Sequence, residues 1–97
     1  MHKIKTVDDL RRVISVIGDG MTQGERTVVM LAPVYGGIVR NCDWGNAATL
    51  KKTECGVEIW LYARIVTVDE YWDEIRRYFL QNYIDCDVIV LDDVLKL

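Results

Sequence analysis

Apolar residues recur at three- and four-residue spacing in two stretches of the chain, which is the pattern of a helix with one buried face. We therefore predict helices over residues 7–17 and 68–83. The apolar positions of the first are Val7, Leu10, Val13, Ile14 and Ile17, and those of the second are Val68, Tyr71, Trp72, Ile75, Tyr78, Phe79 and Tyr83.

Each predicted helix is preceded by residues that favour its start. Thr6 and Asp9 stand three residues apart before the first helix, and Thr67 and Glu70 do the same before the second. A threonine hydroxyl and an acidic side chain at this spacing each accept a hydrogen bond from a backbone N–H group that the first turn leaves unpaired. Both pairs therefore predict capping boxes.

Strict alternation of apolar and polar residues marks residues 57–66, which is the pattern of a strand with one buried face. We predict a single strand here. One face would carry Val57, Ile59, Leu61, Ala63 and Ile65, and the other Glu58, Trp60, Tyr62 and Arg64.

Unbroken apolar runs at residues 27–32 and 87–91 indicate interior strands. Weaker strands are predicted at 38–41 and 48–53, joined by the turn-rich segment 43–46. The second weak strand has an alternative, because residues 47–52 could instead form a short helix.

These elements predict one domain over residues 1–97 with an α/β (α+β) fold. We expect a two-layer sandwich in which a four- to five-stranded mixed sheet carries both helices on one face. A right-handed crossover through the second helix would make the strands at 57–66 and 87–91 parallel. The other face of the sheet would then be left open.

Composition narrows the classes of function. The net charge is −3, so the chain lacks the broad positive field that drives non-specific nucleic-acid binding. A nucleic-acid binder using Arg40, Lys51, Lys52 and Arg64 with the aromatic residues stays as a third hypothesis. The longest apolar runs are far shorter than a membrane span, so we expect a cytoplasmic protein without a signal peptide or anchor.

The three cysteines are Cys42, Cys55 and Cys86, and none belongs to a Cys-x-x-Cys pair. An odd number without metal-ligand spacing predicts free thiols in a reducing compartment, although a pairing of two of them stays open. Cys86 lies between two aspartates, which should raise the pKa of its thiol and disfavour nucleophilic catalysis.

Two features could hold a metal ion or a phosphate. Asp92 and Asp93 follow the apolar run 88–91, as in strands that present a magnesium-binding carboxylate at their end. Gly36 and Gly37 could let backbone amides approach an anion. No Gly-x-x-x-x-Gly-Lys-Ser/Thr loop is present, so nucleotide hydrolysis is not expected.

The nine residues from Val13 to Met21 read Val-Ile-Ser-Val-Ile-Gly-Asp-Gly-Met. This stretch is similar to the strand end that delivers a metal-binding aspartate in alkaline phosphatases, which would make Asp19 a ligand and residues 12–17 a strand. Those enzymes need further carboxylates and histidines for two metals, whereas the only histidine here is His2. We interpret the similarity as chance.

The polar face of the strand at 57–66 is the main candidate for function. Aromatic residues and arginine are enriched at the energetic centres of protein interfaces, so Trp60, Tyr62 and Arg64, with Glu58 beside them, predict a contact surface. The alternative is that the chain itself covers this stripe, with Trp44, Tyr35 or the C-terminal residues 94–97.

The first hypothesis is therefore a small non-enzymatic interaction protein that binds another protein or itself as a homodimer. It would act as an adaptor, inhibitor or regulator without a cofactor, and a phage or mobile-element origin would fit such a role. The second hypothesis is a minimal metal- or phosphate-binding enzyme whose site lies at strand ends. Its residues would be Asp19, Gly36, Gly37, Asp92 and Asp93.

Overall fold

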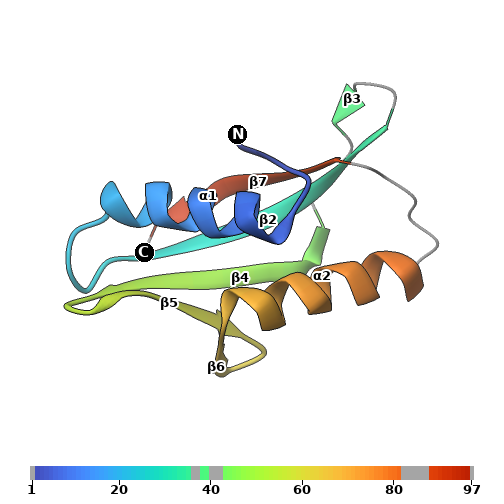
Figure 1. Cartoon of the computed structure of the whole chain (residues 1–97). Helices are drawn as coiled ribbons and strands as arrows, with labels where there is room; N and C mark the ends of the chain where they lie inside the picture. Colours follow the sequence, from blue (N-terminus) through green and yellow to red (C-terminus); the bar gives the residue numbers. More distant parts are fainter. Residues whose placement is uncertain (1, 36–37, 40–42, 82–87, 97) are drawn as a thin grey trace.

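A computed structural model describes residues 2–35, 38–39, 43–81 and 88–96 of the 97. Figure 1 shows two helices packed against a twisted sheet. The helices are α1 (Val7–Asp19) and α2 (Val68–Gln81). The strands are β1 (His2–Ile4), β2 (Arg26–Tyr35), β3 (Ile38–Val39), β4 (Asp43–Thr53), β5 (Gly56–Leu61), β6 (Arg64–Val66) and β7 (Val88–Lys96).

The two-layer α+β sandwich is confirmed, and the sheet contains more strands than expected. In the described part of the chain, seven strands join in the order β1-β7-β2-β4-β5-β6, with β3 paired to β2. Every one of these pairs is antiparallel, so the sheet is not mixed. β5 and β7 are not neighbours, because β2 and β4 lie between them. The expected parallel pairing is therefore wrong.

Both predicted capping boxes are present. The Asp9 amide donates to Thr6 Oγ1 at 3.1 Å, and the Thr6 amide donates to Asp9 Oδ2 at 3.1 Å. The same two bonds join Thr67 and Glu70, each at 3.0 Å. The hydrogen bond from the Thr67 amide is the main cause that lowers the pKa of Glu70. Neither helix among the described residues is long and apolar enough to span a membrane.

One core joins the helices to the sheet. Tyr71 and Ile75 from α2 are each 1 % exposed, and Leu10 from α1 is fully buried. They pack in one cluster with the alternate residues of the strands, so both helices cover the same sheet face. The cluster contains Ile4, Leu10, Val13, Ile14, Ile17, Met21, Val29, Ala48, Leu50, Ile59, Leu61, Val66, Tyr71 and Ile75.

The last turn of α1 lies close to the sheet. A Cβ atom built on Gly18 would lie 2.3 Å from Cγ2 of Val57 in β5, so only glycine leaves room for this contact. Lys52 of β4 donates from Nζ to the Gly18 carbonyl at 2.9 Å. The last turn of α1 contains no basic residue, so Lys52 supplies the cation that the negative end of the helix favours.

β4 is longer than the sequence indicated. The segment 43–46 was predicted as a turn, but it opens β4, and Asp43 pairs with Leu31 of β2. The register shifts between Val29 and Leu31, which marks a bulge or irregularity where a turn was expected. Residues 47–52 are also strand, which excludes the alternative of a short helix there.

The predicted strand at 57–66 is two strands joined by a tight hairpin turn. Tyr62 and Ala63 have φ angles of 51° and 63°, the left-handed values that a two-residue hairpin loop of type I′ has at both positions. Glycine, asparagine or aspartate are usual there, so Tyr62-Ala63 gives no turn signal in the sequence. The turn leaves Ile65, predicted to be buried, 52 % exposed.

This turn predicts that Ala63→Gly stabilises the protein. Glycine adopts positive φ without the steric cost that alanine incurs, so we expect a gain of about 0.5–1 kcal/mol in the free energy of unfolding. A thermal melt measures it as a rise of roughly 2–8 °C. Ala47→Gly, in the strand β4, is the control and should lower the melting temperature. A fall for both variants would contradict the left-handed turn.

Candidate interaction surface

Seven of the described side chains, from four adjacent strands, lie in register on the sheet face opposite the helices, and we call them the open face. The strand register arranges them in two rows. One row crosses the sheet from β2 to β6, and the other joins β4 to β5. The first row contains Val28, Thr49, Trp60 and Ile65, and the second contains Lys51 and Glu58. Arg26 extends the second row onto β2.

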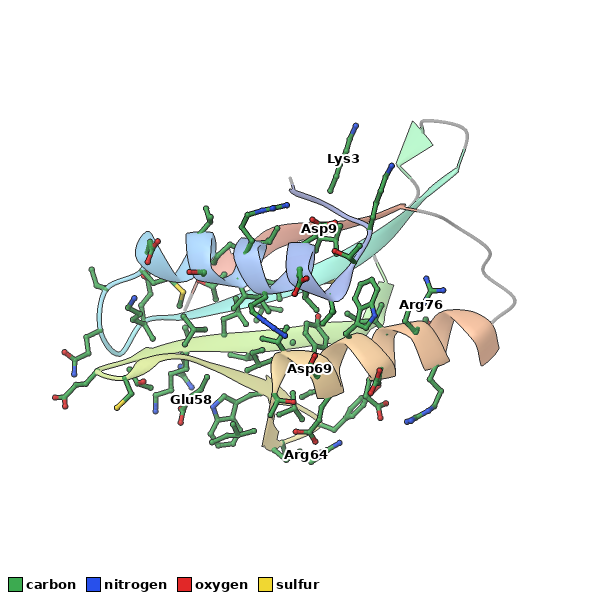
Figure 2. The ribbon with its side chains drawn as sticks, viewed as in Figure 1. Lys3, Asp9, Glu58, Arg64, Asp69 and Arg76 are labelled. Atoms are coloured by element: carbon green, nitrogen blue, oxygen red, sulfur yellow. The ribbon has the colours of Figure 1, made fainter. Side chains whose placement is uncertain are left out.

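Trp60 is the largest side chain of the open face. It is half-buried, and its indole Nε1 donates to Glu58 Oε1 at 3.4 Å. Its cross-strand neighbours are Thr49 on one side and Ile65 on the other. Figure 2 shows Glu58 on the side of β5 that faces away from α1. The structure therefore places Glu58 and Trp60 together, as the sequence predicted.

The hairpin separates Tyr62 and Arg64 from Trp60. Tyr62 lies in the turn with 66 % of its surface exposed. Arg64 forms an ion pair with Glu70 at 3.4 Å, and Figure 2 shows it beside the first turn of α2. The predicted stripe of Trp60, Tyr62 and Arg64 on one strand face is therefore wrong.

The C-terminal strand does not fold over the open face. β7 runs beside β2 as far as Lys96, and Val28 pairs with Leu95. Figure 1 shows β7 continuing in the plane of the sheet toward the C-terminus. The alternative in which residues 94–97 cover Trp60 is therefore wrong for 94–96, and Leu97 lies outside the described residues. The side chains of Tyr35 and Trp44 also lie outside them.

A hollow of about 570 Å³ lies at one end of the open face, where the turn between β4 and β5 meets the loop after α1. Lys51 and Glu58 border it together with Gln23 and Cys55. The thiol of Cys55 is free and exposed. The charged row of the open face therefore continues into a concave edge.

The predicted metal or phosphate site has a different setting from the one expected. Asp92 and Asp93 lie inside β7, paired with Met30 and Val29, and not at the end of a strand. Asp19 is the exposed last residue of α1, which excludes a strand at 12–17. Gly36 and Gly37 lie outside the described residues. Within the described parts of the chain, no three His, Cys, Asp or Glu side chains group as metal ligands.

The basic residues of the nucleic-acid hypothesis do not share one surface. Lys51 lies on the open face, whereas the Lys52 ammonium contacts α1 and Arg64 contacts Glu70. Arg40 lies outside the described residues. A phosphate backbone needs several cations along one path, and these three do not form one.

Sequence reasoning missed Val28, Thr49 and Ile65 as members of the open face. Val28 belongs to an unbroken apolar run in which neither face stands out, and Ile65 changes face because of the hairpin. The alternation of Glu58 and Trp60 was the only signal for this surface. Comparisons of the chain with protein-family models, with curated proteins and with solved structures found no match.

Proposed function

We propose that this chain is a non-enzymatic protein-interaction module, an adaptor, inhibitor or regulator, whose contact surface is the open face. The observation that carries the proposal is the row of Val28, Thr49, Trp60 and Ile65 on the sheet face that the described helices leave uncovered.

The composition of this face supports protein binding. Tryptophan buries a large area with few rotatable bonds, and apolar neighbours around it keep water out of a contact. Trp60 is flanked by Thr49 and Ile65, and the charged row of Lys51 and Glu58 runs beside them. An apolar centre with a charged rim is typical of interfaces that form and dissociate. Within the row, Ile65 is 52 % exposed and Trp60 is half-buried, so both retain surface that a partner could cover.

A cytoplasmic location belongs to the same proposal. The exposed free thiol of Cys55 fits a reducing compartment, where such thiols are not oxidised to disulfides.

Photo-cross-linking in cells tests this function, because the chain offers a matched control. Ile65 on the open face and Val16 on α1 are branched apolar residues with 52 % and 53 % exposure. A photoreactive amino acid at position 65 should give a covalent adduct with another polypeptide, and the same amino acid at position 16 should give little. Adding Trp60→Asp should remove the adduct from position 65.

Two results would contradict the proposal. The first is no adduct from position 65 in a chain that melts like the wild type. The second is equal adduct from positions 16 and 65, which would mean random collision. A thermal melt of Trp60→Asp shows whether this substitution preserves the fold. If the fold is lost, Ile65→Glu is used as the disrupting variant instead of Trp60→Asp.

A further inference from the structure

We propose that the partner of the open face is a second copy of this chain, bound face to face about a two-fold axis. The axis runs parallel to the strands, midway between β4 and β5. This inference rests on the proposed function, because it takes the open face as the contact surface and adds the identity and geometry of its partner.

The order of the strands makes the open face complementary to itself. From β2 to β6 the first row reads Val28, Thr49, Trp60, Ile65. A half-turn about the proposed axis reverses this order across the sheet. Each row keeps its position along the strand direction. Thr49 then lies opposite the partner's Trp60, and Val28 opposite the partner's Ile65. The small residues of one copy thus face the large residues of the other.

The charged row constrains the orientation of the two copies more strongly than the first row does. Lys51 of β4 and Glu58 of β5 are cross-strand neighbours on either side of the axis. The same rotation places Lys51 opposite the partner's Glu58, and Glu58 opposite the partner's Lys51. Opposite charges therefore meet twice. Arg26 lies at the rim of the contact, because β6 of the partner copy does not extend along the strand direction as far as the charged row.

Another two-fold axis in the same plane, perpendicular to the strands, fits less well. It would place each strand over its own copy and exchange the two rows, so that Glu58 would face the partner's Trp60 and Arg26 the partner's Val28. Two packed sheets align within about 30°, so the residues nearest the axis stay matched despite the twist. The pattern of charge and size therefore selects the axis along the strands.

The size of the face predicts a weak dimer. At a spacing of about 4.8 Å, three strands over some six residues and β6 over its three residues present roughly 350 Å² per copy. The two copies together then bury about 700 Å², which is below the size of stable interfaces. We expect a reversible dimer with a dissociation constant in the micromolar range or above.

Charge reversal tests this geometry. Lys51→Glu places like charges opposite each other twice, and Glu58→Lys does the same with the opposite sign. Each variant alone should dimerise at least about tenfold more weakly than the wild type in light scattering at protein concentrations of about 10 µM to 1 mM. An equimolar mixture should form a heterodimer, because both positions are then acidic in one copy and basic in the other. The double variant carrying both reversals should form a homodimer.

The mixture separates a contact between copies from effects within one chain. Lys51 and Glu58 are neighbours in the same sheet, so each single reversal also costs some stability, which a thermal melt measures. Mixing the two variants leaves that cost unchanged and restores only the contact between copies. Glu74→Lys and Arg77→Glu reverse an ion pair on α2 and serve as controls that should leave the dimer intact.

Three results would overturn the inference. They are a wild type that stays monomeric throughout the concentration range, a dimer that either single reversal leaves unchanged, and a mixture that forms no heterodimer. If the wild type is monomeric but position 65 still cross-links to a different protein, the proposed function stands and only the second copy is wrong. If no adduct forms either, both proposals fall.

Discussion

Replacing Gly18 with alanine should destabilise the protein by about 2 kcal/mol, because the new methyl group has no room between α1 and β5. Its Cβ atom would lie 2.3 Å from Cγ2 of Val57, so the helix or the valine must move. Alanine would otherwise favour the helix by up to about 1 kcal/mol, a gain that is smaller near a helix end. Urea unfolding measures the loss, and a thermal melt should fall by roughly 8–16 °C.

Two further variants show whether the contact with Val57 is the cause. Val57→Ala removes the methyl group that the new Cβ would meet. The double variant should therefore lose less free energy of unfolding than the two single variants lose in sum. Gly20→Ala is the matched control, because its Cβ would meet only the Ile17 carbonyl at an ordinary 3.5 Å. A Gly18→Ala variant as stable as Gly20→Ala would contradict the close approach of α1 to the sheet.

Stability should fall above pH 10 for the wild type but less so for Tyr71→Phe. Tyr71 is 1 % exposed, and its desolvation raises the pKa of the phenol well above 10.0, with a smaller contribution from nearby Tyr62. The folded state therefore keeps a proton that the unfolded chain releases near pH 10. As the pH rises beyond this value, the wild type should lose up to about 1.4 kcal/mol per pH unit through this group.

Urea unfolding of both proteins from pH 8 to pH 11 measures this effect as a difference. Other tyrosines and lysines titrate in both proteins, so subtraction leaves the contribution of Tyr71. The difference should be constant up to about pH 9.5 and then grow in favour of Tyr71→Phe. A difference that stays flat to pH 11 would show that the Tyr71 hydroxyl ionises as readily in the folded protein as in the unfolded chain.

The alternation of apolar and polar residues predicted only part of the open face correctly. Glu58 and Trp60 were predicted from alternation, and the structure places them together on one face. Alternation assumes that the strand continues, however, and the chain reverses at Tyr62 and Ala63. Because Trp60 pairs with Ile65, even positions before the turn share a face with odd positions after it. Tyr62 and Arg64 were therefore assigned to the wrong surface.

The amino-acid sequence by itself determined the two helices, their capping boxes and the α+β class. These features depend on residues three or four apart, so the spacing of apolar side chains and the pairs Thr6–Asp9 and Thr67–Glu70 specify them locally.

Only the tertiary structure decided the strand order, the hairpin at Tyr62–Ala63 and the side chains that meet on the open face. It also decided that Lys52 binds the end of α1 and that Gly18 lies against Val57. The physical reason is that these contacts join residues far apart in the chain. Burial of the whole core can stabilise a left-handed turn or a close helix contact that local preferences oppose.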